Sequence, residues 1–502
     1  MFFPLMVLLL TGGLASPSTA WAQTSSDSLT VIESYVQRAL SSNHALQQER
    51  ADLKRSFAAL KEARGAFLPR LDLEARYSRA TGGRSIDVPA GDLVNPVYET
   101  LNDLTGTQRF TPVENVSEPF LRETEQDTRL RMEQPLFVPR ILYNYRANQH
   151  RVEARTAAVA ALRRAITRDV KRAYFSYLQA HRAVEIFRAT EALTEESLRT
   201  NERLFQKTRV TKDVVLRAKA DVLDVRQQRV HAEKDRRLAR SYLNVLLNRP
   251  LDTPVQRPDG FDDHPSPTGS HEALLRITLG PDAVTSWSRL QHAAARDLVA
   301  LQRDALSQRP ELQQVDRSIA AAAQGVRAAQ ARYIPEVVLA VDTGIQGTRY
   351  GFDGDKPFAM GSIVLRWNLF NGLRDAARVE QAQWTQRRLK ARQDDIRLSV
   401  KREVEAAHQN VQALRATLSA AEERVPAAQE SFRLTHRRHA EGMTNRVTLV
   451  DARTTLTDAQ LNLSVTRYDY LKRLAELEYA VGLAGPTLRA DAFRADAAPL
   501  GR

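Results

Sequence analysis

Cysteine is absent from the 502 residues of the chain. This excludes disulfide bonds, zinc ribbons, thiol nucleophiles and a lipid-bearing N-terminal cysteine. Glycine and proline are scarce, with 21 of each, and because these residues interrupt helices and strands, their scarcity predicts long regular elements. Beyond the N-terminus there is no apolar stretch of about 18 residues, so no membrane-spanning helix is predicted.

Motifs for catalysis and nucleotide binding are also missing. The sequence has no P-loop, no G-x-G-x-x-G and no G-x-S-x-G. His436 and His439 lie three residues apart, but the positive charges of Arg437 and Arg438 between them disfavour a metal ion. We therefore expect no catalytic site, no metal site and no cofactor. The net charge is +13, yet acidic and basic residues are interspersed, so no nucleic-acid partner is expected.

Residues 1–22 have the features of a secretory signal peptide. They carry no charged side chain, residues 5–10 form a short apolar run, and Ala20-Trp21-Ala22 is a small-x-small cleavage site. A membrane helix would need a longer run, and Pro17 interrupts this one. We expect the leader to be removed and the chain to be exported.

The sequence repeats itself weakly. Residues 39–48 align with residues 305–314, and at the same offset Phe67-Leu68-Pro69 falls on Tyr333-Ile334-Pro335. This order favours two structural copies in one chain. The predicted division is a first repeat over 28–249, an inter-repeat segment over 250–303, a second repeat over 304–482 and a flexible tail over 483–502.

Each copy begins with a helical period, over about 29–66 and 304–332, and then changes to the alternation of a strand. Two strands per copy are predicted, near 71–77 and 130–136, then 337–341 and 363–369. Alternation between apolar and charged residues means that one face of the sheet is wet. A soluble sandwich shows the same pattern, but the strand length of about ten residues favours a membrane barrel. The predicted lipid face comprises Leu71, Leu73, Ala75, Tyr77, Leu130, Met132, Ile363, Leu365 and Trp367. The residues predicted to line a hydrated lumen on the opposite face are Glu74, Arg76, Arg129, Arg131 and Arg366.

Very long helices are predicted after each pair of strands. Residues 140–249 contain neither proline nor glycine, and apolar residues from Ile166 to Phe187 recur at spacings of four and three. A second seam runs from Val404 to Val425 with the same spacing. This repeat is typical of left-handed coiled coils, and Pro426 is expected to kink its helix. The turns near 208–212 and 441–445 would then lie at the far end of the helices from the strands.

Taken together, these features resemble the TolC-type outer-membrane efflux channel family, the outer membrane factors. The similarity covers about residues 28–482, and Ala305-Leu306 with Pro310 and Leu312 matches the family pattern A-L-x-x-x-P-x-L. The strongest local match is at residues 442–456, which resemble the second tip hairpin of the family, G-x-x-x-x-x-D-x-x-D-A-x-x-T-L. Asp451 falls on one acidic position of that hairpin and Thr448 on the other, so the family's double aspartate ring is not reproduced.

The resemblance implies a mixed α/β membrane protein in the outer membrane of a Gram-negative cell. Four strands per chain would form a trimeric 12-stranded transmembrane β-barrel, which continues into a long periplasmic α-helical coiled-coil barrel. The implied function is the exit duct of a tripartite efflux pump or type I secretion system. The implied partners are two further copies of the chain, a periplasmic membrane-fusion (adaptor) protein, an inner-membrane pump of RND or ABC type, and outer-membrane lipid. Cargo stays open, and a coiled-coil scaffold without a channel is the alternative.

Two further expectations concern the ends of such a channel. Residues 81–126 are rich in Pro, Gly, Asn and Thr and lack helical periodicity, which predicts an external loop. The opposite end, at the two helical turns, carries charges of both signs that we expect to hold a periplasmic gate closed. The predicted gate residues are Arg209, Lys212, Asp213, Arg446, Thr448 and Asp451.

Overall fold

The computed structural model describes residues 31–119, 121, 123–258, 297–348 and 357–483. The predicted leader, most of the inter-repeat segment and the predicted tail, except residue 483, lie outside this part of the chain. The described residues belong to two compact units. The first, which we call the helical unit, is formed from residues up to 43, 166–296 and 407–478; the second, the sheet unit, is formed from 44–165, 297–406 and 479 onward.

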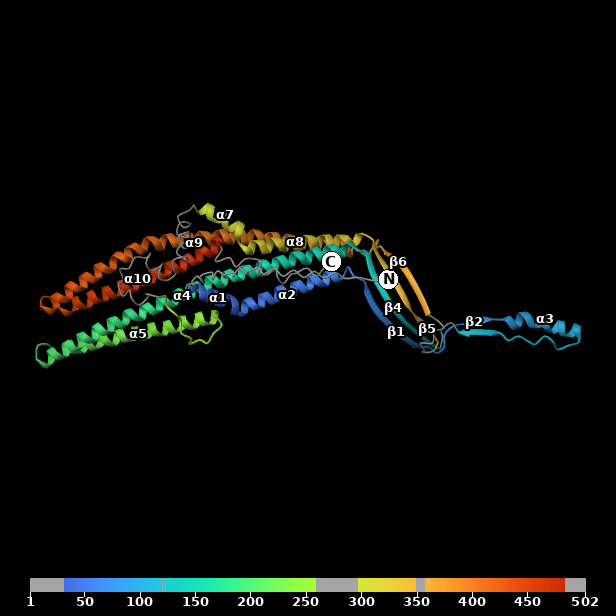
Figure 1. The fold of residues 1–502 in the computed structure, drawn as a ribbon, viewed down its shortest axis with the longest axis horizontal. Helices are drawn as coiled ribbons and strands as arrows, with labels where there is room; N and C mark the ends of the chain where they lie inside the picture. The colour runs from blue at the N-terminus through green and yellow to red at the C-terminus, as the bar shows by residue number, and fades with distance from the viewer. Residues whose placement is uncertain (1–30, 120, 122, 259–296, 349–356, 484–502) are drawn as a thin grey trace, which may run out of the picture. The chain divides into compact units, whose positions relative to one another are not determined.

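Helices dominate both halves of the sequence (Figure 1). The first half contains α1 (Val31–Ser42), α2 (His44–Gly65), α3 (Ala90–Thr105), α4 (Pro139–Gln206) and α5 (Lys212–Leu246). The second half contains α7 (Leu298–Gln308), α8 (Pro310–Gln330), the 3-10 turn η1 (Ala331–Tyr333), α9 (Arg374–Ala440) and α10 (Arg446–Val481). The long helices α4 and α9 have 68 and 67 residues, so the very long helices predicted after each pair of strands are confirmed.

The prediction of a single helix over about 29–66 was wrong, because the chain forms two helices, α1 and α2, separated at Asn43. The Ser42 hydroxyl donates to the carbonyl of Leu247 at 3.0 Å, and the Asn43 amide donates to Leu246 at 3.4 Å. Asn248 in turn donates to the carbonyl of Ser42 at 3.2 Å. The Ser42 carbonyl, which a continuous helix would pair internally, thus finds its partner in Asn248, and the carbonyls at the end of α5 find theirs in Ser42 and Asn43.

The prediction of a single helix over 304–332 was also wrong: the segment forms two helices, α7 and α8, and the first begins earlier than predicted, at Leu298. Arg309 separates α7 from α8 with extended backbone angles, φ −73° and ψ 124°. Pro310 follows, and a residue before proline is sterically disfavoured in the helical conformation. Proline is well suited to the first turn of the next helix, where its missing N–H costs nothing. By contrast, α9 continues through Pro426, and the kink there stays a prediction.

The four predicted strands exist and form one antiparallel sheet in the order β1-β4-β5-β6. Figure 1 shows them side by side. Their bounds are β1 (Arg70–Arg79), β4 (Thr124–Phe137), β5 (Glu336–Gly347) and β6 (Pro357–Arg366). Because β6 ends at Arg366, Trp367 lies outside the strand, which corrects the prediction of a strand to residue 369. The indole of Trp367 instead donates to the carbonyl of Tyr333 at 3.1 Å.

The segment between β1 and β4 is not the irregular loop that the sequence predicted. It contains the short ribbon of β2 (Ser85–Val88) and β3 (Val116–Pro119) and the 16-residue helix α3. Two asparagines hold the returning chain against this helix. Asn102 exchanges hydrogen bonds with the backbone of Phe110 at 2.8 and 3.0 Å, and Asn95 does the same with Val113 at 2.9 and 2.7 Å. These side-chain bonds, spaced seven residues apart, stabilise a helix that proline and asparagine content argued against.

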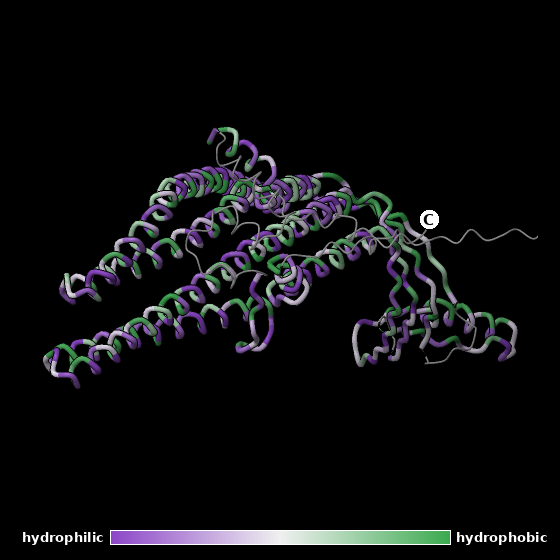
Figure 2. Tube along the Cα trace, turned by 60° about the vertical axis from the view of Figure 1, so that its left-hand side comes forward, coloured by the Kyte–Doolittle hydropathy of each residue, from purple (hydrophilic) through white to green (hydrophobic). Residues whose placement is uncertain are grey.

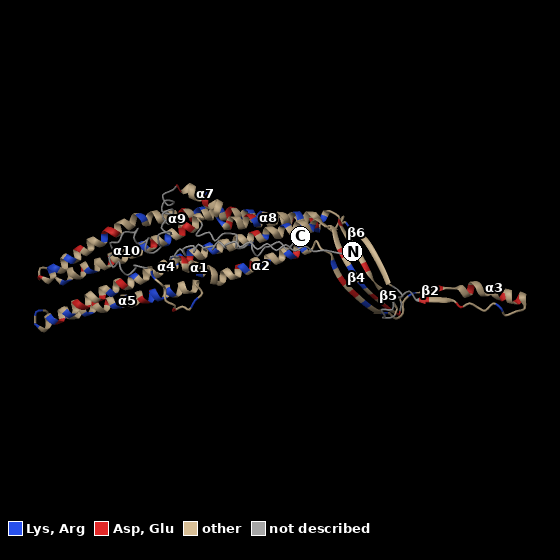
Figure 3. Ribbon diagram, viewed as in Figure 1, with Lys and Arg blue, Asp and Glu red and all other residues tan. Residues whose placement is uncertain are grey.

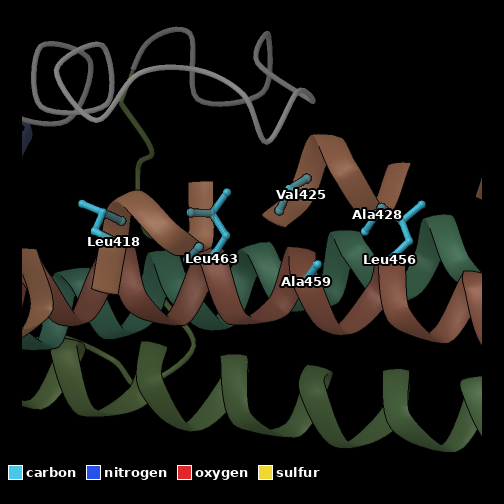
Figure 4. Packing of buried hydrophobic residues seen from close by; sticks show 7 residues of the cluster. Leu418, Val425, Ala428, Leu456, Ala459 and Leu463 are labelled. Atoms are coloured by element: carbon cyan, nitrogen blue, oxygen red, sulfur yellow. The ribbon is translucent and has the colours of Figure 1, made fainter. Parts of the chain in front are cut away.

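The coiled-coil seams predicted in the long helices are buried. In α4, Val170 and Val184 are fully buried, and Val404 and Val425 are fully buried in α9. Within the helical unit, α9 packs against α10 through a cluster of small and branched side chains (Figure 4). Its members are Leu418, Ala421, Val425, Ala428, Leu456, Ala459 and Leu463. The alanines allow the two helix backbones to approach closely, and Figure 2 shows hydrophobic and hydrophilic residues alternating along such helices.

No helix among the described residues is both long enough and apolar enough to cross a membrane.

Candidate functional site

The apolar face of the sheet is formed by residues that the register places in one layer. Leu71 faces Met132, Leu73 faces Leu130, and Ile363 faces Leu339. Most of these side chains are exposed rather than packed into a core: Leu73 and Ile363 are each 73% exposed, whereas Met132 and Leu339 are half-buried. An exposed apolar layer of this extent marks contact with a membrane or another protein. The register places eight of the nine residues predicted for the lipid face in this layer, all except Trp367: Leu71, Leu73, Ala75, Tyr77, Leu130, Met132, Ile363 and Leu365.

The opposite face of β1 and β4 is charged, and along most of its length residues of opposite sign face each other. Four successive pairs do so: Arg70–Glu133, Asp72–Arg131, Glu74–Arg129 and Arg76–Asp127. Figure 3 shows the alternating charges on these strands and the near absence of charge on β6. Facing opposite charges stabilise a register, because a slip by one residue would bring charged side chains to the apolar layer.

At the centre of this face, five charged side chains from three strands form a connected network, which we call the charge ladder. Arg129 donates to one carboxylate oxygen of Glu74, from Nε at 2.9 Å and from Nη2 at 2.7 Å. Arg131 binds both carboxylate oxygens of Asp342 on β5, at 2.7 and 3.3 Å. Weaker ion pairs of 3.9 Å join Arg131 to Glu74 and Arg129 to Asp127. Sequence reasoning found the arginines and Glu74 but missed Asp342, whose pairing depends on the position of β5.

The first helical turn of the predicted gate lies between α4 and α5. Thr208 has a positive φ of 56°, which lets the chain reverse. The hydroxyl of Thr211 donates to the carboxylate of Asp213, and this bond, aided by Arg217 at 3.7 Å, lowers the pKa of Asp213 below its usual value. Arg209 and Lys212 are exposed.

The second turn lies between α9 and α10. Gly442 has φ 75°, a conformation that suits glycine. Asn445 then precedes α10, and its side-chain oxygen accepts hydrogen bonds from both the backbone N–H and the hydroxyl of Thr448, each at 3.0 Å. Thr448 therefore contributes to the cap that starts the helix. Of the predicted gate residues, Asp451 is exposed and forms no ion pair within the described part of the chain.

Arg446 connects the two hairpins in the helical unit. It donates to Asp221 on α5 at 2.7 Å and also to the backbone carbonyl of Val214. The Arg446 and Asp221 side chains are only 17% and 28% exposed. Arg453 lies about two turns further along α10 and is partly buried beside them. Burial lowers the pKa of Arg453, although the negative charge of Asp221 acts to raise it. Sequence reasoning missed Asp221 and Arg453, because it paired Arg446 only with charges inside the two turns.

The two histidines of α9 have ordinary local contacts. His436 packs against the ring of Phe432 at 5.8 Å, and Nδ1 of His439 lies 3.2 Å from the carbonyl of Thr444. Among the described residues, no group of three or more potential metal ligands is assembled.

Comparison with known proteins assigns the class. The sequence profile described as outer membrane efflux protein matches residues 35–249 and 301–483. The chain is 24% identical over 462 residues to the outer membrane protein TolC of Salmonella enteritidis, covering 89% of this chain and 80% of that protein. It is 23% identical over 356 residues to the alkaline protease secretion protein AprF of Pseudomonas aeruginosa, covering 70% and 69%.

The fold agrees with this assignment. The structure of the Campylobacter jejuni CmeC outer membrane channel superposes with a TM-score of 0.70 at 14% identity, covering 98% of this chain and 97% of that one. The sheet and the long helices are thus those of an outer-membrane channel for efflux or secretion, extending into the periplasm. The chain belongs to the outer membrane efflux protein family.

Proposed function

We propose that three copies of the chain assemble into a closed 12-stranded barrel in the outer membrane, joined to a helical tunnel in the periplasm. The observation that carries this proposal is the sheet: one face is apolar and exposed, and the other is charged and internally paired. Lipid contact accounts for the first face and a water-filled lumen for the second. The same order of elements in both halves, in which helix and two strands are followed by a long helix and a shorter one, supports two copies of one structural unit per chain.

The edges of the sheet support assembly. In the order β1-β4-β5-β6, strands β1 and β6 are at the edges, and in lipid their unpaired backbone groups would each cost several kcal/mol. Pairing of β6 with β1 of the next chain removes every edge. Four strands are too few for a closed barrel, whereas three chains of four give twelve, wide enough for water.

Mass measurement in mild detergent tests this assembly. We expect a particle of about three times the 56.4 kDa chain mass, reduced by loss of the leader. The species should migrate as an oligomer on a gel when unheated and as a monomer after boiling. A stable monomer at working concentration would contradict the barrel and favour the scaffold alternative.

We propose that this duct works with a periplasmic adaptor and an inner-membrane pump of RND or ABC type. The names of the relatives support both routes, since one is a protease secretion protein and others are efflux pump components. Cargo is then chosen mainly by the pump. Co-purification of the chain with an adaptor and a pump from the cells that produce it tests the partnership directly.

We also propose that the turns at the end of the helical unit close the tunnel. The pair between Arg446 and Asp221 supports this, because it ties the two hairpins of one chain together. Removal of either side chain should release the hairpins, so Arg446→Ala and Asp221→Ala should each raise single-channel conductance in planar bilayers. We expect Asp451 to pair with a residue of a neighbouring chain, so Asp451→Ala should also raise single-channel conductance.

The control for the gate is Glu196→Ala. Glu196 is 60% exposed on α4, and its ion pairs within the described residues are with Arg199 and Arg203 of its own helix, so conductance should be unchanged. Wild-type conductance in Arg446→Ala and Asp221→Ala would leave these charges as a structural contact and assign opening to the adaptor.

The topology predicts which segment faces the outside of the cell. Protease added to intact cells should cut the extension between β1 and β4, at Arg84 or Arg109, before any site in the long helices. Both arginines are exposed in irregular backbone, which proteases prefer. Cleavage first within α4 or α9 of intact cells would reverse the proposed orientation.

A further inference from the structure

We propose that the charge ladder on β1, β4 and β5 sets the ionic selectivity of the barrel. This inference rests on the proposed function, which places the charged face of the sheet toward the lumen. The ladder contains three carboxylates, Glu74, Asp127 and Asp342, and two guanidinium groups, Arg129 and Arg131. It therefore carries a net charge of −1 per chain, so opposite charges almost cancel where the wall is most densely charged.

The ladder is held rigidly enough to act as a fixed charge pattern. Asp342 is 6% exposed in its side chain and is bound by both Nε and Nη2 of Arg131. Gly344, two residues further on β5, lets that strand approach β4 closely: a Cβ there would lie 2.1 Å from the carbonyl oxygen of Thr128. A larger residue would push β5 away from Arg129 and Arg131. The close strand spacing and the bidentate bond thus keep each charge beside its partner.

On β5 and β6 the rest of the same face adds little fixed charge near the ladder. On β6 the register places Phe358, Met360, Ser362 and Val364 on this face, and β5 adds Val338 and Ala340. The remaining charged residues of the face lie on β1 and β4 or at the starts and ends of strands: Arg70, Asp72, Arg76, Glu125, Glu133, Glu336 and Arg366. Arg70 and Asp72 pair with each other at 2.7 Å. The face as a whole then has seven carboxylates and five guanidinium groups.

Charged rings in a narrow pore select ions of the opposite sign, because low-dielectric walls focus their field. In the proposed trimer, removal of one charge per chain changes the charge at one level of the lumen by three. Loss of an acid makes the ladder neutral and weakens the preference for cations, whereas loss of Arg131 leaves two excess negative charges per chain and strengthens that preference. The wild-type ladder, with one excess negative charge per chain, lies between these two cases.

The experiment measures the potassium-to-chloride permeability ratio from reversal potentials in planar bilayers under a salt gradient. Asp342→Asn should lower the ratio by about three-fold or more, and Arg131→Gln should raise it by a similar factor. The double variant Asp342→Asn with Arg131→Gln should return the ratio close to that of the wild type, because it removes one charge of each sign. Glu74→Gln, at a carboxylate 47% exposed, should lower the ratio like Asp342→Asn with less risk to folding.

Opposite shifts in the single variants and their cancellation in the double variant support the inference. Channels that conduct normally but keep the wild-type ratio in Asp342→Asn, Glu74→Gln and Arg131→Gln overturn it and leave the channel function intact. A wild-type protein that inserts but gives no conductance overturns the proposed function itself, which is a different result.

Discussion

Replacement of Leu73 by arginine should sharply reduce the amount of assembled protein in the outer membrane. Leu73 is the fourth of ten residues in β1, faces Leu130, and exposes 73% of its surface on the apolar layer. A guanidinium on the lipid side of a barrel costs about 2–4 kcal/mol near the bilayer midplane. A trimer would carry this cost three times, so the oligomer band of the unheated sample should fall to a small fraction of the wild-type band.

Two comparisons make this result specific. Leu365 is the penultimate residue of β6, so arginine there should lie closer to the membrane interface and reduce assembly less. Ser78 lies on the charged face of β1, opposite Glu125, and Ser78→Arg should assemble nearly as well as the wild type. Equal losses for Leu73→Arg and Ser78→Arg would indicate that both faces are packed, as in a soluble sandwich.

Replacement of Arg309 by alanine should destabilise the sheet unit by about 3 kcal/mol, since removal of one partner leaves buried charge uncompensated. Arg309 is only 4% exposed. It pairs with Glu311 at 3.0 Å and with Glu403, and its guanidinium lies 4.8 Å from the centre of the Tyr479 ring. Burial alone would raise the pKa of Glu311, but the hydrogen bonds from Arg309 outweigh it and hold that pKa below its usual value.

The measurement is thermal unfolding followed by circular dichroism. Arg309→Ala should lower the transition by about 5 °C or more. The matched control is Arg397→Ala on α9, where Arg397 and its partner Asp394 are 49% and 70% exposed, and such a surface pair contributes at most about 1 kcal/mol. If both variants melt at the wild-type temperature, the Arg309 cluster contributes no net stability.

Local patterns in the sequence determined much of the fold. The lack of proline and glycine predicted α4, the spacing of apolar residues from Val404 to Val425 predicted α9, and alternation predicted the four strands of the sheet. Alternation also predicted which side chains share the apolar layer, because successive strand residues point to opposite faces. Each of these properties depends on neighbours a few positions apart, so the sequence alone contains them.

Boundaries that depend on distant contacts could not be predicted. The break at Asn43 is stabilised by Leu246 and Leu247, about 200 residues away in sequence. Helix α3 was missed because its stability comes from the amides of Asn95 and Asn102 pairing with the returning chain rather than from helical periodicity. Trp367 was assigned to the last strand because it continues the alternation, although the pairing of β6 with β5 ends at Arg366.

Partners within the sites were decided by tertiary structure in the same way. The sequence identified Arg446 as a gate candidate but not Asp221, which lies 225 residues earlier and meets it only when α5 and α10 pack. It identified Arg131 but not Asp342, which depends on the register between β4 and β5. The sequence by itself determined which residues are apolar, charged or helix-forming, since those are properties of single residues and short spacings. Only the folded chain decided which charges meet, because an ion pair forms over a few ångströms in space and no local pattern encodes that distance.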